Sequence, residues 1–221
     1  MRAGLGFLLL WPVAVAAQDF IEVVGALSDE DFYRLVACAA PPGAPCAKPF
    51  LHWPTERPIS VAIVQVDDAY LGGKQKRAFA AVERAVQYIN RVDSGITLRV
   101  GTPEDADIKI YLIDTDGSAP ISGTGVKGVD GATVGGARVI VWSRADTHVI
   151  SRAQVIFSTR LNIRQYESAM IEEVTQALGL LTDIRTPVYE GVSVFSQDSN
   201  AAKDLGPQDI MALRRHYPKE E

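Results

Sequence analysis

Apolar runs of strand length recur through the middle of the chain. Most are rich in β-branched residues, and their length and composition favour extended backbone over helix. They predict strands at residues 59–66, 96–100, 106–114, 137–143 and 153–159. The run at 106–114 alternates between apolar and polar positions until its end, so we expect one of its faces to contact solvent.

Apolar residues at helical spacing predict an amphipathic helix over residues 74–92. Phe79, Val82, Val86 and Ile89 fall on one side of it, and we expect this stripe to pack on the sheet. Two shorter helices are indicated by their end signals. Ser28 followed by three acidic residues begins one, and a proline followed by Gln and Asp begins the last, at residues 207–216.

A further helix is predicted at about residues 163–178. Its apolar stripe includes Met170 and Val174, Glu172 and Gln176 lie on the opposite side, and Glu173 falls at the edge of the stripe. The complete order of elements, with helices and strands mixed and no internal repeat, indicates one α+β domain.

The first residues have the pattern of a secretion signal. Arg2 precedes an apolar run, Leu5 to Val15, that is too short for a stable membrane span, and small residues favour cleavage after Ala17. No Cys follows the cut and no later run is long enough to cross a bilayer. We therefore expect residues 1–17 to be removed and the mature chain to be periplasmic or secreted, with no membrane span.

The net charge of −5 excludes a nucleic-acid partner, because no basic stripe is present to neutralise phosphates. Only two cysteines occur, Cys38 and Cys46, and an oxidising compartment favours a disulfide between them. We expect residues 18–52 to form an N-terminal extension stapled by this bond, and residues 53–221 to form the main domain.

Residues 115–136 are rich in glycine. A phosphate-binding loop would end in Gly-Lys-Ser/Thr and lead into a helix, and neither feature is present. The segment is therefore interpreted as a long loop or irregular hairpin beside the sheet.

The stretch Met170 to Asp183 reads MIEEVTQALGLLTD and resembles the active-site helix of zincin metallopeptidases. That helix carries His-Glu-x-x-His-x-x-Gly, and here Glu172 and Gln176 replace the histidines while Glu173 keeps the general-base position. SVFSQDSN, with Phe195 at the methionine position, resembles the turn beneath the zinc. LGPQDIMALRRHYP resembles the closing helix of matrixin-like peptidases. The resemblance implies a zincin-like fold: a twisted mixed sheet, a backing helix, an active-site-type helix and a small C-terminal lobe.

A more specific resemblance is to an uncharacterised family of secreted bacterial proteins with the pattern Glu-Glu-x-Thr-Gln-x-Leu-Gly. Glu172, Glu173, Thr175, Gln176 and the following Leu-Gly carry it. It covers the chain from about Trp53 to Tyr217, and it implies a degenerate relative of the zincins.

These residues do not suit an orthodox zinc peptidase. Zinc requires neutral imidazoles one helical turn apart and a third ligand, which would fall at Thr182. His52, His148 and His216 have no histidine partner at ligand spacing and are interpreted as surface or helix-end residues.

Three other interpretations remain open: a site for a non-zinc metal ion, a hydrolase and a non-catalytic module. Glu172, Glu173, Asp183 and Asp198 could converge on a Ca²⁺, Mg²⁺ or Mn²⁺ ion, although no cofactor is firmly indicated. Alternatively, a partly buried Glu173 could act as the general base of a peptide or glycan hydrolase.

The interpretation we favour is a pseudoenzyme: a non-catalytic binding or structural module of the cell envelope. Glu172, Gln176 and Thr175, with Asp183 and Asp198, would line a cleft for an envelope protein, peptide or glycan. Glu172 and Gln176 should then project into a groove between the sheet and the small lobe.

Overall fold

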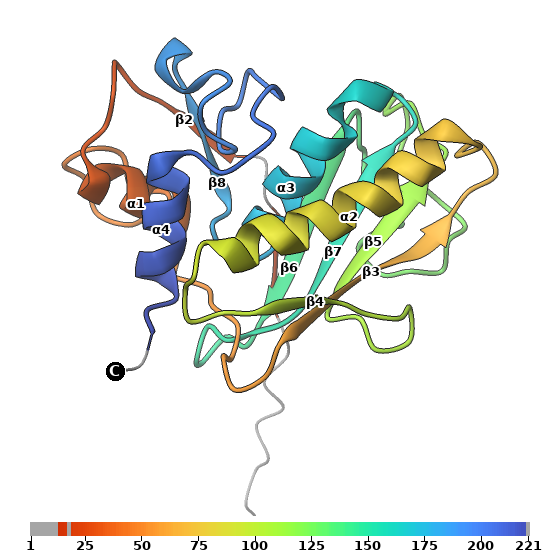
Figure 1. Cartoon of the computed structure of the whole chain (residues 1–221), viewed down its shortest axis with the longest axis horizontal. Coiled ribbons are helices and arrows are strands. Elements are labelled where there is room, and N and C mark those ends of the chain that lie inside the picture. The colour runs from red at the N-terminus through yellow and green to blue at the C-terminus, as the bar shows by residue number, and fades with distance from the viewer. Residues whose placement is uncertain (1–12, 17–18, 220–221) are drawn as a thin grey trace, which may run out of the picture.

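The computed structural model describes residues 13–16 and 19–219 and contains two β-sheets (Figure 1). The larger sheet has the strand order β1-β6-β7-β5-β3-β4. Its strands are β1 (Val13–Ala16), β3 (Ile59–Val66), β4 (Leu98–Val100), β5 (Ile108–Ile113), β6 (Ala137–Ser143) and β7 (Ile150–Ser158). The strands β4, β3, β5 and β7 run parallel, whereas β6 is antiparallel to β7 and β1 is antiparallel to β6. This mixed sheet with helices confirms the α+β class.

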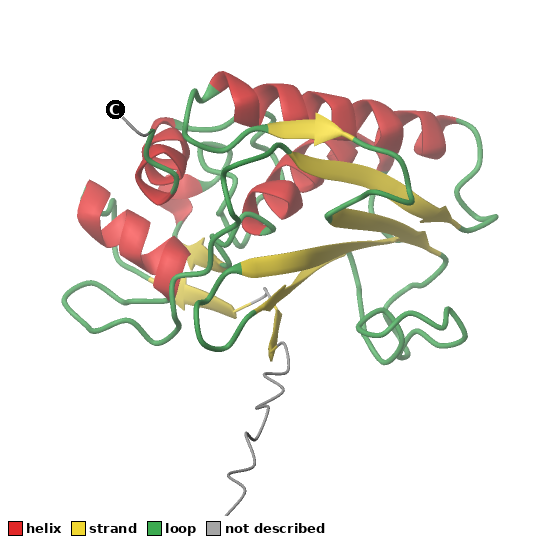
Figure 2. Ribbon diagram, turned by 90° about the horizontal axis from the view of Figure 1, so that it is seen from below, coloured by secondary structure: helices red, strands yellow, loops and turns green. Residues whose placement is uncertain are grey.

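Two helices cover one face of the large sheet (Figure 2). They are α2 (Gly73–Arg91) and α3 (Tyr166–Gln176), which a 3-10 turn precedes at Ile163–Gln165. The predicted stripe of α2 is buried through Val82, Val86 and Ile89, but Phe79 is 46% exposed. The prediction therefore holds only in part for Phe79, which is half-exposed and lines a surface pocket with Ala62 and Val100 of the sheet.

The other face of the sheet is buried too, which corrects the expectation of a solvent-exposed face on the 106–114 strand. Tyr111 and Ile113 of β5 pack in a second apolar cluster. The glycine-rich segment contributes Ile121, Val129 and Val134 to this cluster. This segment is an irregular loop, as predicted, but it covers the sheet instead of lying beside it, and its apolar residues exclude water from β5.

A smaller lobe packs beside the sheet. It contains the short parallel sheet of β2 (Asp19–Glu22) and β8 (Thr182–Arg185), the helices α1 (Asp29–Cys38) and α4 (Pro207–His216), and a 3-10 turn at Pro187–Tyr189. The predicted cap is present, since the Asp31 amide donates to the Ser28 hydroxyl at 3.1 Å. The predicted disulfide joins Cys38 to Cys46 just after α1. The extension at residues 18–52 thus supplies β2 and α1 to this lobe.

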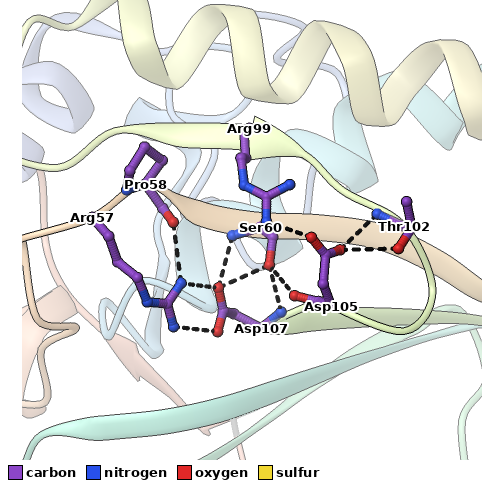
Figure 3. Close-up of polar contacts among 7 residues, drawn as sticks. All are labelled: Arg57, Pro58, Ser60, Arg99, Thr102, Asp105 and Asp107. Carbon is purple, nitrogen blue, oxygen red and sulfur yellow. Dashed lines mark hydrogen bonds and ion pairs between the residues drawn. The ribbon is translucent and has the colours of Figure 1, made fainter.

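A polar network ties together the first residues of β3 and β5 (Figure 3). The carboxylate of Asp107 accepts hydrogen bonds from both terminal nitrogens of Arg57, at 2.7 Å, and from the Ser60 amide at 2.9 Å. Asp105 pairs with Arg99 in the adjoining turn. The network lies at the amino ends of the parallel strands, where it links the start of β3 to the residue before β5.

The described residues include no helix long and apolar enough to span a membrane. Most of the predicted signal, residues 1–12 and 17, lies outside the described part of the chain, but residues 13–16 form β1.

Candidate functional site

The polar residues of the α3 motif meet at one pocket. A pocket of about 390 Å³ lies between α3, the start of β6, β8 and the loop that follows β8. Its wall combines polar side chains with small and apolar ones: Phe20, Gly136, Ala137, Leu161, Ala169, Glu172, Glu173, Gln176, Asp183, Gln197 and Asn200. Ala137 pairs with Phe157 at the carboxyl end of β7. The pocket therefore lies at the carboxyl ends of the parallel strands, and the Asp107 network lies at their amino ends.

The helix α3 supplies much of the polar wall. Glu172 and Gln176 are one turn apart and therefore project from the same side of the helix. Glu173 points about 100° away from Glu172, yet it lines the same pocket. Glu173 is 6% exposed and Gln176 3% exposed, so both are far more buried than an amphipathic surface helix would leave them.

Gly179 allows the chain to turn from α3 into β8. Its φ is +103°, and a Cβ atom at this position would lie 1.9 Å from the carbonyl oxygen of Leu51. Only glycine fits such a close approach. The turn brings Asp183 of β8 back against α3, where the Gln176 side-chain amide donates a 2.6 Å hydrogen bond to its carboxylate.

Burial raises the pKa of all three carboxyl groups in the pocket. The pKa of Asp183 is raised to about 7 by burial, against the opposing effects of the Gln176 hydrogen bond and of Lys48. Burial, followed by the charges of Asp183 and Glu173, raises the pKa of Glu172. Burial and the Asp183 charge also raise the pKa of Glu173, and Arg138 opposes them. The three groups therefore resist simultaneous ionisation.

One oxygen of this cluster lacks a hydrogen-bond partner. Glu173 Oε2 is buried, and no group of the described residues donates to it. A buried acceptor without a donor costs about 1–3 kcal/mol. The pocket is therefore chemically suited to a ligand that brings a hydrogen-bond donor or a positive charge.

Two of the expected cleft residues lie elsewhere. Thr175 is fully buried and does not line the pocket, and its hydroxyl has no hydrogen-bond partner in the described part of the chain. Asp198 is half-exposed and accepts hydrogen bonds from Nε and Nη2 of Arg185, at 3.1 and 3.2 Å. The structure thus brings together Glu172, Glu173 and Asp183 but does not bring Asp198 to the pocket.

The arrangement of the described side chains does not form a metal centre. Within residues 13–16 and 19–219, no group of three or more His, Cys, Asp and Glu residues is placed to hold an ion. His52 and His148 are exposed. His216 ends α4 as expected but is buried, with Nε2 2.7 Å from the Leu51 carbonyl, and burial lowers its pKa to about 4.

Sequence analysis missed the walls that come from distant segments. Phe20 and Ala137 belong to no motif, Gly136 ends the glycine-rich segment, and no local signal places the three residues beside α3. It also missed the path of the N-terminal segment, in which β1 pairs with β6 and β2 pairs with β8. Because β6 and β8 both contribute residues to the pocket, the strands β1 and β2 each pair with an element that forms the pocket wall.

No curated protein matches the chain closely enough to count as a relative. Residues 16–220 match the family described as protein of unknown function (DUF2927), and the chain therefore belongs to this family.

Proposed function

We propose that the mature chain is an exported, non-catalytic zincin-like module that binds an extended peptide segment of an envelope protein. The peptide would lie antiparallel to β6 and place one side chain in the adjoining pocket. The observation that carries this proposal is the pairing of β1 with β6, in which Ala16 lies opposite Ile140 and Val13 opposite Ser143.

Removal of the predicted signal peptide would open this edge of the sheet. Cleavage after Ala17 takes away β1 and leaves the outer backbone groups of residues 140–143 without that partner. An exposed strand edge is a template for pairing with another chain, and strand addition is a common mode of peptide recognition.

The zincin-like interpretation is supported by the placement of α3 and α4. Glu172 and Gln176, at the two positions where zincins carry histidine, both line the pocket. Gly179 turns the chain out of the helix, and the closing helix α4 packs in the small lobe with α1. An acidic residue and an amide in place of two imidazoles favour ligand binding over zinc chemistry.

Peptide binding can be tested with a chain that begins at Gln18 and a labelled peptide of the sequence WPVAVAA, residues 11–17. Fluorescence anisotropy should show saturable binding. Two matched control peptides carry N-methyl groups on alternate backbone nitrogens, one peptide on the odd-numbered residues and the other on the even-numbered residues. Because only one of these two sets of nitrogens faces the partner strand, one control should lose at least about tenfold in affinity and the other should not. Equal binding of all three peptides, or no binding, would refute strand addition.

A second candidate, hydrolysis with Glu173 as general base, is favoured by one observation. Burial and the Asp183 charge raise the pKa of Glu173, as a general base requires. The mature chain should then cleave a peptide or glycan library, with and without added Ca²⁺, Mg²⁺ or Mn²⁺, and Glu173→Gln should abolish turnover. Turnover unchanged in that variant would exclude Glu173 as the base.

A further inference from the structure

The wall of the pocket contains a hydrogen-bonding group that the described residues leave unused. Glu173 is 6% exposed and lines the pocket, and its Oε2 has no hydrogen-bond partner in the described part of the chain. The neighbouring Gln176 amide does not fill this role, because it donates to Asp183 at 2.6 Å. A buried polar atom without a partner destabilises the protein. A ligand that pairs with Glu173 Oε2 would remove this cost.

The protonation of the carboxyl cluster favours a neutral ligand. Burial raises the pKa of Glu172 and of Glu173, and it raises the pKa of Asp183 to about 7. At neutral pH the cluster therefore holds protons and does not carry its full negative charge. A protonated carboxyl donates and accepts hydrogen bonds, whereas an ionised one only accepts. A hydroxyl group also donates and accepts, so it can pair with Glu173 in either form.

The rest of the wall combines further polar groups with apolar surface. Gln197 and Asn200, from the segment that follows β8, add side-chain amides, which both donate and accept. Phe20 is 40% exposed and adds an aromatic ring, and Leu161 adds an aliphatic side chain. Because Arg185 lies 3.6 Å from the centre of the Phe20 ring, over one face, the ring reaches the pocket by its other face or its edge.

We propose that this pocket binds a neutral sugar residue of a glycan, with one sugar hydroxyl paired to Glu173 Oε2. A sugar ring has several hydroxyl groups around apolar C–H faces, which matches a wall of carboxyl and amide groups beside an aromatic ring. The volume of about 390 Å³ lies within the range of small-molecule sites, roughly 300–1,000 Å³. The inference names a second ligand for the pocket. It does not rest on strand addition at β6, and the two proposals can fail separately.

Isothermal titration calorimetry at pH 7, with the chain from Gln18, tests this inference. The neutral probes are cellotetraose, chitotetraose and galactotetraose, and tetragalacturonate is the acidic match of galactotetraose. We expect at least one neutral tetramer to bind saturably at millimolar concentration or below. Tetragalacturonate should bind at least about tenfold more weakly than this tetramer, because its charges would meet a carboxyl cluster. No saturable binding of any neutral tetramer, or binding of tetragalacturonate that is equal or tighter, would overturn the inference.

Variants of the pocket wall assign the binding to this site. Glu173→Ala removes the unpartnered oxygen and should weaken binding of the sugar at least about tenfold. Glu173→Gln keeps a donor and an acceptor at the same place, so it should stay within about threefold of the original chain. A loss in Glu173→Gln as large as that in Glu173→Ala would overturn the pairing with a hydroxyl group.

A variant at an exposed residue keeps the test independent of core packing. Asn200 is exposed, and Asn200→Ala should weaken binding at least about threefold without disturbing the fold. The matched control Asp198→Asn alters a side chain outside the pocket and should leave the affinity unchanged. Affinity that survives both Glu173→Ala and Asn200→Ala, in proteins with native circular dichroism, would place the sugar elsewhere and overturn the assignment. If Glu173→Ala does not fold, Asn200→Ala alone decides it.

Discussion

The substitution Asp183→Asn should stabilise the folded chain at alkaline pH. Asp183 is 6% exposed, lies beside two glutamates that share its pocket, and has a pKa raised to about 7 by burial. Asparagine has nearly the same shape, and its side-chain oxygen can still accept the hydrogen bond that Gln176 now donates to Asp183. The substitution therefore removes a buried charge and preserves the contact between α3 and β8.

The magnitude follows from the difference in pKa between the two states. An aspartate in an unfolded chain ionises near pH 4 and Asp183 in the folded chain near pH 7, so the folded state holds more protons between these values. Stability therefore falls as the pH rises from about 4 to about 7. At 1.36 kcal/mol per pK unit, ionising Asp183 costs roughly 4 kcal/mol above pH 7. Burying the asparagine amide itself costs about 1–3 kcal/mol. The net gain in stability at pH 8 is therefore about 1–3 kcal/mol.

Urea unfolding, followed by tryptophan fluorescence from pH 4.5 to pH 8.5, measures this gain. Near pH 4.5, where Asp183 is protonated in the folded chain, the variant should be equal to the original chain or up to about 2 kcal/mol less stable, and at pH 8 it should exceed it by about 1–3 kcal/mol. The control Asp198→Asn removes an exposed, paired carboxylate and should show no such gain. A variant whose advantage is absent at pH 8, or is the same at both ends of the range, would refute the assignment of a raised pKa to Asp183.

Three further predictions concern the scaffold. Gly179→Ala should lower the free energy of unfolding by roughly 2–5 kcal/mol. The left-handed backbone costs alanine about 1–2 kcal/mol, and overlap with Leu51 costs about 1–3 kcal/mol. A loss below about 1 kcal/mol in thermal unfolding would contradict the close approach. Replacing Cys38 and Cys46 with serine should cost about 2–3 kcal/mol through loop entropy, as measured by urea unfolding, and a reductant should produce the same loss in the original chain but none in the variant. Asp107→Asn should lower the free energy of unfolding by about 2 kcal/mol at pH 7. Hydrogen bonds from Arg57 and Ser60 hold the pKa of Asp107 low against the effect of burial, so the loss of stability in the variant should shrink as the pH falls below about 4. A loss that does not depend on pH would contradict this.

Much of the secondary structure could be predicted because it depends on local spacing. The strand at residues 59–66 has the bounds that its β-branched run predicted, and the helix expected at 163–178 forms as a 3-10 turn followed by α3 at Tyr166–Gln176. Ser28 caps α1 as its position before three acidic residues indicated. In each case the signal and the structure that it specifies lie within a few residues of one another.

The parts that could not be predicted depend on long-range contacts. Phe79 has the periodicity of a core residue, but the fold leaves it half-exposed beside Ala62 and Val100 of the sheet. The glycine-rich segment buries the second face of β5, which the alternation in residues 106–114 does not reveal. Asp198 lies only a few residues from pocket-lining Gln197 and Asn200, yet its partner is Arg185 rather than the carboxylates. Such choices are made by tertiary packing, and no local pattern encodes them.

The pocket illustrates the same division. The α3 motif singled out Glu172, Glu173 and Gln176, because their spacing and the following glycine already define one helical segment and its end. The apposition of Asp183 depends on the turn at Gly179, and the wall contributed by Ala137 depends on the order of strands in the sheet. The sequence therefore identified the helical residues of the site and Asp183 of β8, and it left the wall formed by β6 unassigned.

Hydrogen exchange at β6 tests peptide binding most directly. In a chain that begins at Gln18, the outward-facing amides within residues 140–143 have lost their β1 partner and should exchange quickly. Adding the peptide WPVAVAA at saturating concentration should slow their exchange at least about tenfold, whereas the amides paired with β7 should be unaffected. Unchanged exchange at these positions, or protection that appears only at other elements, would contradict the binding of a peptide along this edge.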